Sequence, residues 1–260
     1  MTDKFEACAQ IVRQYDPDRY FSALFAPAEK RPLLFALYAF NHELARVAET
    51  VREPMMGEIR LQWWRDALEG ARKGTPRRHD VVEALAELVQ RIDLPQALFD
   101  TMIDARAFDS STDTFADYPA LETYADETSG NVMRLAARIL GAGEGCDALA
   151  QDAGIAYGLT GLLRTLPFHT VRHKLYLPTN LLSILSISED DVFARHDGQK
   201  LKAAINQTAI HARDRFWKAR GMARPRVALP AFLHATLVPL YLKRMTRRWF
   251  DPFHHSPEVP

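Results

Sequence analysis

Apolar residues in this chain recur with the period of an α-helix along most of its length. Residues 28–50 carry them at steps of three and four: Leu33, Leu34, Ala36, Leu37, Phe40, Leu44, Val47 and Ala48. This spacing places the apolar side chains on one face of a helix. Convincing strand alternation is absent throughout, so the sequence predicts an all-α fold.

The same periodicity predicts further helices at residues 57–73, 79–92, 94–109, 118–141, 145–166, 198–221 and 228–249. Helix-breaking residues separate them, among them Pro54, Pro95 and Pro178. No internal repeat or long linker divides the chain. We therefore expect one all-α domain over residues 1–250, with a polar loop at 109–117 and a flexible tail at 251–260.

Composition narrows the class of protein. With 33 basic and 33 acidic residues, the formal net charge is zero, so we expect no nucleic-acid partner. The two cysteines, Cys8 and Cys146, make neither a disulfide framework nor a zinc cluster and suit a reducing compartment. The first residues are acidic early and lack a long apolar run, so we expect neither a secretory signal nor a transit peptide there. We expect a cytoplasmic protein, with a peripheral contact at the inner face of the inner membrane as a further hypothesis.

Several segments, in a fixed order, carry a family resemblance. They are Arg31 with Phe35–Phe40, the run Leu61-Gln62-Trp63-Trp64-Arg65, Asp109, Tyr124–Gly130 and Gly154–Pro178. Together they resemble the squalene/phytoene synthase family. The resemblance implies an isoprenoid-synthase helical fold around a central pocket, and an ancestry in Mg²⁺-dependent condensation of allylic diphosphates.

The chain departs from the family at the two acidic motifs. The resemblance places the first motif on residues 45–49, where Ala45 and Arg46 precede the single acid Glu49, and the second on Thr165 and His169. Mg²⁺ prefers carboxylate and other hard oxygen ligands. We therefore expect degenerate catalytic positions, no metal site and no cofactor, with Glu49 either solvated or paired with Arg46.

The histidines offer no better metal site. His42, His169 and His173 are candidates for ligands or bases, but their spacing closes no ligand set. Hydrogen bonding or solvent exposure is the alternative for each of them.

The resemblance also implies ligand-binding residues. A residual site for an anion, either a diphosphate or a phospholipid head group, would use Arg31, Arg164, Arg172, Lys174 and Tyr176. The alternative is that these are exposed or internally paired charges. The pocket wall would include Tyr38, Trp63, Met133 and Tyr157. The basic and aromatic run Tyr241–Phe250 fits either a membrane or partner contact, or a helix with its aromatic residues packed inward.

Three functional hypotheses follow. Tyr20 with Pro27–Arg31, Ala39–Ala45 and Thr165–His169 resemble the family's non-catalytic branch, which includes a mitochondrial complex I assembly factor. That branch implies a pseudoenzyme that binds a respiratory complex I subunit or assembly intermediate. The alternatives are a divergent prenyltransferase of terpenoid biosynthesis, which would need Mg²⁺, and an isoprenoid- or phospholipid-binding protein.

Overall fold

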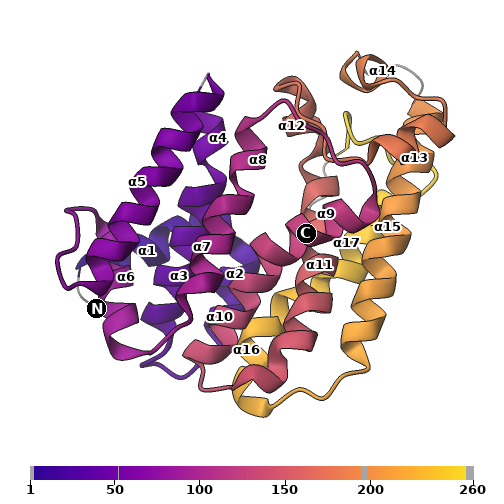
Figure 1. Ribbon diagram of the computed structural model, residues 1–260. Coiled ribbons are helices and arrows are strands. Elements are labelled where there is room, and N and C mark those ends of the chain that lie inside the picture. Colours follow the sequence, from indigo (N-terminus) through magenta and orange to yellow (C-terminus); the bar gives the residue numbers. More distant parts are fainter. Residues whose placement is uncertain (1–2, 52, 195–197, 256–260) are drawn as a thin grey trace. The chain divides into compact units, whose positions relative to one another are not determined.

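The structure, a computed structural model, describes residues 3–51, 53–194 and 198–255. Its regular elements within these ranges are all helices, which confirms the predicted fold class (Figure 1). The chain divides into two compact units, each built from three separate segments. Unit 1 comprises Met1–Ser111, Asn131–Ala150 and Ala223–His234, and unit 2 comprises Thr112–Gly130, Gln151–Met222 and Ala235–Pro260. The prediction of a single domain over residues 1–250 stays a prediction.

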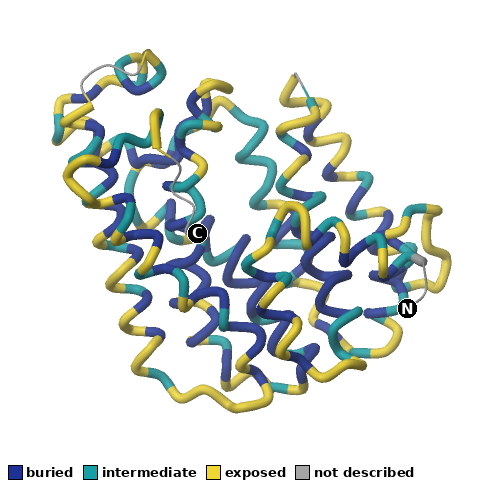
Figure 2. The backbone as a smooth tube through the Cα atoms, turned by 180° about the vertical axis from the view of Figure 1, so that it is seen from behind, coloured by how far each residue is buried: buried dark blue, intermediate teal, exposed yellow. Residues whose placement is uncertain are grey.

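Unit 1 is organised around α3 (Arg31–Ala45), which is buried along most of its length. Pro32 in the first turn presets the backbone for the helix and has no N–H to leave unpaired. Helices α1 (Asp3–Tyr15) and α6 (Asp80–Arg91) pack against α3 and against each other, and α5 (Pro54–Arg72) packs against α6. Figure 2 shows the buried residues concentrated along the inner faces of these helices.

The remaining elements of unit 1 are shorter. They are α2 (Pro17–Ala23), α4 (Val47–Thr50), α7 (Gln96–Ala105), α8 (Ala107–Ser110), α10 (Asn131–Ile139), the 3₁₀ turns η2 (Glu144–Cys146) and η3 (Arg226–Ala228), and α16 (Leu229–Phe232). Asp16 caps α2 by accepting a hydrogen bond from the Arg19 N–H.

Unit 2 contains α9 (Tyr118–Ala125), the π-helical turn η1 (Asp126–Gly130) and most of α11 (Asp147–Arg164). It continues with α12 (Leu166–Val171), α13 (Thr179–Ile184), α14 (Glu189–Phe193), α15 (Gly198–Arg220) and α17 (Val238–Met245). The 3₁₀ turn η4 (Leu233–Leu237) leads from unit 1 into α17. Helices α15 and α17 pack together, and the Lys202 ammonium donates to the carbonyls of Met245 and Phe250.

The structure breaks several of the predicted helices. The stretch 28–50 is interrupted at Arg46, between α3 and α4, and 118–141 is interrupted by the π turn at Asp126–Gly130. The stretch 228–249 becomes η3, α16, η4 and α17, because Pro230 and Pro239 each lack the N–H that a continuing helix needs. The predicted tail is described only to residue 255; residues 256–260 lie outside the described ranges.

The C-terminal basic and aromatic run combines both expected arrangements. Tyr241 and Phe250 are buried, whereas Trp249 keeps 54% of its surface exposed.

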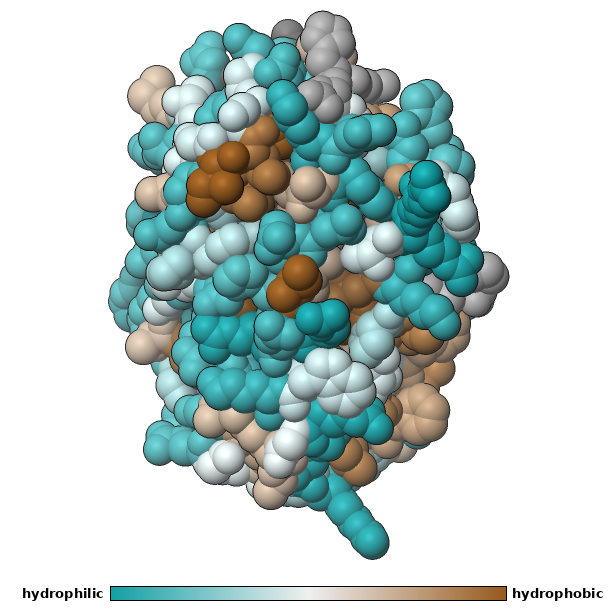
Figure 3. All heavy atoms as spheres, turned by 90° about the vertical axis from the view of Figure 1, so that its right-hand side faces the viewer, coloured by the Kyte–Doolittle hydropathy of each residue, from teal (hydrophilic) through white to brown (hydrophobic). Residues whose placement is uncertain are grey.

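Figure 3 shows the face that carries α13 and α15, where apolar residues form separate small patches in a mainly hydrophilic surface. None of the helices in the described ranges has both the length and the apolar composition to cross a membrane.

Candidate functional site

The first predicted motif position lies at the end of α3 in unit 1. Arg46 follows the last residue of the helix, Ala45, and its exposed guanidinium forms an ion pair with Glu43 at 3.6 Å. Glu49 lies in the short helix α4 and is exposed. Arg46 thus pairs with Glu43 one turn earlier, and the exposed Glu49 agrees with the solvated alternative.

His42 lies one turn before Arg46 on the same helix. Its ring stacks on Tyr15 with centroids 4.4 Å apart, and its Nε2 atom is buried with no hydrogen-bond partner in the described part of the chain. Burial lowers the pKa of His42, which favours the neutral imidazole.

The second predicted motif position lies in unit 2, where α11 ends. Helix α11 stops at Arg164, and Pro167 sits in the first turn of α12, so the chain bends at Thr165. The Thr165 hydroxyl donates to the Gly161 carbonyl at 2.8 Å. The His169 ring lies 4.7 Å from the Tyr176 ring, centroid to centroid. Both side chains of the predicted motif thus have intramolecular contacts.

The five residues of the predicted anion site have different surroundings. Arg31 lies in unit 1, where its Nε donates to the Ala26 carbonyl at 2.8 Å. The other four lie in unit 2. The Arg164 guanidinium lies 3.9 Å from the centre of the Tyr241 ring, and that of Arg172 lies 3.9 Å from the centre of the Phe168 ring.

Lys174 and Tyr176 are both buried. The Lys174 ammonium donates to the Asp113 carbonyl at 2.9 Å, so at least one of its three N–H donors is used inside the protein. The Tyr176 ring belongs to an aromatic cluster with Phe115, Tyr124 and His169. The role of these residues in anion binding stays a prediction.

The four predicted pocket residues divide between the units. Tyr38 and Met133 are fully buried in unit 1, and Tyr157 is buried in unit 2. The Tyr38 hydroxyl has no hydrogen-bond partner within the described ranges, and burial is the main cause that raises its pKa. Trp63 is half-buried and forms an edge contact with the buried ring of Trp64. The two tryptophans therefore differ in depth, as their adjacent positions on one helix require.

Unit 2 holds a small apolar cavity at the second motif position. Its volume is about 10 Å³, close to that of a single water probe. Leucine side chains supply most of its wall, and Thr208 and two predicted site residues, His169 and Tyr176, supply the rest. The lining residues are Leu121, Leu159, Leu162, Leu163, Leu166, His169, Tyr176, Leu177 and Thr208.

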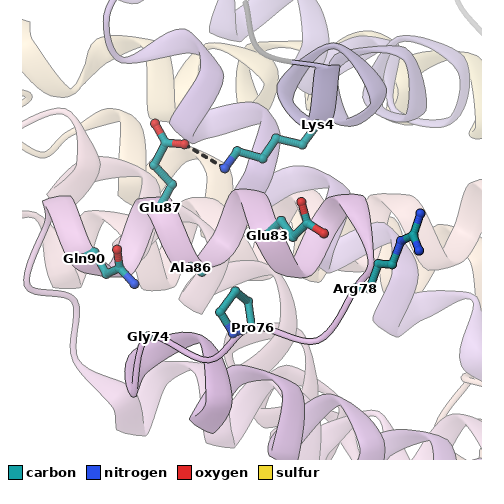
Figure 4. Close-up of a pocket in the computed structure, with 8 residues that line it drawn as sticks. All are labelled: Lys4, Gly74, Pro76, Arg78, Glu83, Ala86, Glu87 and Gln90. Atoms are coloured by element: carbon teal, nitrogen blue, oxygen red, sulfur yellow. Dashed lines mark ion pairs between the residues drawn. The ribbon is translucent and has the colours of Figure 1, made fainter.

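Unit 1 has an open polar groove of about 390 Å³. Its walls come from α1, from the connection between α5 and α6, and from α6 (Figure 4). The Lys4 ammonium crosses it to the Glu87 carboxylate at 3.0 Å. None of its lining residues is one that the sequence predicts for ligand binding. The lining residues are Lys4, Gly74, Pro76, Arg78, Glu83, Ala86, Glu87 and Gln90.

An ion-pair network in unit 2 was not predicted from the sequence. Arg215 of α15 donates to Glu122 of α9 through two nitrogens and to Asp152 of α11 at 2.8 Å. Lys218 also pairs with Asp152, at 3.0 Å. Asp152 is 1% exposed, so both cations are needed to compensate its burial. The sequence signal that could have indicated this network is the place of Asp152, an acidic residue on the apolar face of a predicted helix.

Two acids of these units are each held by basic partners. Asp152 is bound to Arg215 and Lys218, and Asp109 is paired with Arg106 at 3.0 Å. Within the described part of either unit, no group of three or more His, Cys, Asp or Glu side chains is arranged to hold a metal ion.

The fold and these positions define the class of protein. The profile of the squalene/phytoene synthase family matches residues 12–260, and the chain belongs to this family. A solved squalene synthase, HpnC from Alicyclobacillus acidocaldarius, has a similar fold, with a TM-score of 0.81, 22% sequence identity, and 96% of this chain and 95% of that chain covered. The predicted isoprenoid-synthase fold is thereby confirmed.

Curated relatives add detail within the family. The chain is 31% identical over 252 residues to the human NADH dehydrogenase (ubiquinone) complex I, assembly factor 6, covering 96% of this chain and 76% of that protein. It is 25% identical over 279 residues to a phytoene synthase of Arthrospira platensis, covering 100% of this chain and 89% of that protein.

Proposed function

We propose that this chain is a non-catalytic member of the family that acts by binding, in the assembly or maturation of respiratory complex I. The observation that carries the proposal is the chemistry of the two motif positions. Neither position supplies the paired carboxylates that Mg²⁺-dependent ionisation of an allylic diphosphate requires.

At the first position, the fixed charge has the wrong sign for a metal site. Arg46 projects from the end of α3 and is held by Glu43, so that carboxylate is already neutralised by a cation. A divalent ion near Glu49 would experience repulsion from Arg46 and would have one carboxylate to bind. The residues present there fit Mg²⁺ poorly.

The second position fits Mg²⁺ no better. The Thr165 hydroxyl uses its proton on the Gly161 carbonyl, and a neutral hydroxyl is a weak substitute for a carboxylate. His169 offers an imidazole, which suits zinc or other transition metals more than Mg²⁺. Its ring packs against the Tyr176 ring, and both side chains line a small cavity whose other walls are mostly leucine. We derive no catalytic step through a metal here.

Similarity to the human assembly factor supports the choice of partner. That relative is 31% identical across 96% of this chain, and it is named as a complex I assembly factor. We propose that this chain binds a complex I subunit or an assembly intermediate, and that it does so at the inner face of the inner membrane.

Deleting the gene tests this proposal. We expect loss of assembled NADH dehydrogenase on native gels, with unchanged carotenoid and hopanoid content. Re-expression of the wild-type chain should restore the complex. Loss of the isoprenoid products with normal NADH dehydrogenase would contradict the proposal and favour synthesis.

A divergent prenyltransferase is the second candidate, because the similarity to a phytoene synthase extends over the whole chain. It predicts turnover of farnesyl or geranylgeranyl diphosphate in the presence of Mg²⁺. A lipid carrier would instead retain an isoprenoid or phospholipid without converting it. Mass spectrometry of lipids that co-purify with the native chain separates that case from a role confined to protein binding.

A further inference from the structure

Exposed aromatic and aliphatic side chains cluster at the end of α2 in unit 1. Phe21, Leu24 and Phe25 are 62%, 39% and 75% exposed. Their spacing of three and four places them on one side of the helix and the turn that follows it. The opposite side is anchored: Ser22 and Ala23 are buried.

The base of this cluster is rigid. The Tyr20 ring stacks on Phe35 of α3 with centroids 5.3 Å apart, and Phe21 makes an edge contact with Tyr20 at 5.6 Å. The exposed rings are therefore presented by a packed helix. A fixed display of large apolar side chains to solvent is unfavourable unless something covers it.

A second apolar pair comes from another part of the chain. Helix α16 packs against α2 within unit 1. Val227 and Leu229, at the start of this segment, are 47% and 38% exposed. We name the five exposed side chains Phe21, Leu24, Phe25, Val227 and Leu229 the apolar surface of unit 1.

Basic residues accompany this surface. Arg224 and Arg226 are exposed beside Val227, and Lys30 follows the turn after Phe25. The α2 segment itself, residues 16–31, is balanced, with three acids and three bases: Asp16, Asp18, Glu29, Arg19, Lys30 and Arg31. Within residues 223–234, the segment of unit 1 that carries Val227 and Leu229, the only Lys, Arg, Asp or Glu residues are Arg224 and Arg226.

We propose that the apolar surface of unit 1 inserts into the head-group region of an anionic phospholipid bilayer. Exposed phenylalanines provide the insertion, and the basic residues around them match the negative charge of the lipid phosphates. The inference concerns location and holds whether or not the chain binds complex I.

Co-sedimentation of the full chain with lipid vesicles tests the proposal. We expect binding to vesicles of phosphatidylcholine mixed with phosphatidylglycerol, and much less to phosphatidylcholine alone. The double variant Phe21→Ser/Phe25→Ser should lower partitioning at least about tenfold, because it removes both rings from the insertion. Arg224→Glu/Arg226→Glu should abolish the preference for the anionic vesicles and leave the weak residual binding.

Ile184→Ser is the matched control, since Ile184 is 79% exposed but lies in α13 of unit 2. It should bind vesicles as the wild type does. Thermal unfolding shows that each variant is folded, and Phe25→Ser alone serves if the double variant is not. The proposal is overturned if vesicles are not bound, if the phenylalanine variants bind like the wild type, or if these variants only dissociate a dimer seen by sedimentation velocity.

Discussion

At the residue scale, a close backbone approach joins α11 to the π turn in unit 2. A Cβ atom added at Gly154 would lie 2.3 Å from the Gly130 Cα. Only hydrogen fits in that space, because both partners are backbone. At Gly161 of the same helix, an added Cβ would meet nothing within 4 Å. The two glycines therefore have opposite tolerance for a side chain.

We expect Gly154→Ala to lower the free energy of unfolding by about 1–3 kcal/mol through overpacking. Gly161→Ala is its matched control and should raise that free energy by up to about 1 kcal/mol, because alanine favours the helix over glycine. Urea unfolding followed by circular dichroism measures both. Equal effects of the same sign would show that the Gly130 contact does not limit this helix.

The buried His234 of unit 1 predicts a pH dependence. Its ring is 1% exposed, and its pKa lies well below the usual value because of burial and, to a smaller extent, the charge of Arg19. The unfolded chain takes up the proton first as the pH falls, so stability is full above about pH 6.5 and declines below it.

Each pH unit below about 6.5 should cost at most about 1.4 kcal/mol from this residue. His234→Leu should make the profile between pH 7.5 and 5 less steep, and the contribution of the buried His42 should remain. A change at the exposed His255, as in His255→Gln, should leave the profile as in the wild type. Denaturant titrations over this pH range provide the test. A profile for His234→Leu that is as steep as that of the wild type would contradict the assignment.

At the element scale, one ion-pair network joins three helices of unit 2. Arg215 of α15 bridges Glu122 of α9 and the buried Asp152 of α11. Hydrogen bonding to Glu122 is the main cause that raises the pKa of Arg215. Removing Arg215 would leave the buried Asp152 with Lys218 as its remaining basic partner, and the loss of compensation for a buried charge costs more than the ion pair itself contributes.

Arg215→Met should therefore lower the free energy of unfolding by about 3 kcal/mol, since Asp152 loses its closest cation. The matched control is Lys73→Met, which removes an exposed pair with Glu69 on α5 and should change stability by less than about 1 kcal/mol. Thermal and urea unfolding measure the two effects. Similar small losses from both variants would show that the network is not a significant tie between these helices.

The sequence predicted the long helices well and the short ones poorly. Apolar spacing identified α3, α5, α6 and α15, because each presents a long stripe to a core. Helices α12, α13 and α14 have five or six residues and therefore too few turns to show a period. The stretch 228–249 was predicted as one helix because it is rich in apolar residues throughout. Its backbone nevertheless changes between α-helical and 3₁₀ turns near Pro230 and Pro239, and apolar composition does not reveal this change.

At the scale of the whole molecule, family membership and fold followed from ordered motifs. The details of the site did not, because they depend on contacts between residues far apart in sequence. Lys174 donates to Asp113, and Asp152 binds Arg215. Such pairings carry no local sequence pattern, so a basic residue near a motif cannot be distinguished from an internal tie by spacing alone.

The proposed assembly role makes a prediction for the degenerate positions. In the deletion strain, the variants Arg46→Ala and Thr165→Ala should restore assembled NADH dehydrogenase to within about twofold of the wild type, since exposed surface substitutions change stability little. Native gels with in-gel activity staining give the readout. Loss of rescue by both variants, with normal protein levels, would indicate that these positions take part in function.

The central claim is that this helical scaffold does not ionise prenyl diphosphates. Its most direct test is incubation of the purified chain with farnesyl diphosphate and geranylgeranyl diphosphate in Mg²⁺ buffer, with product detection by mass spectrometry. The account predicts no condensed product above the level of the heat-denatured chain. Formation of a product that disappears on addition of EDTA would contradict it.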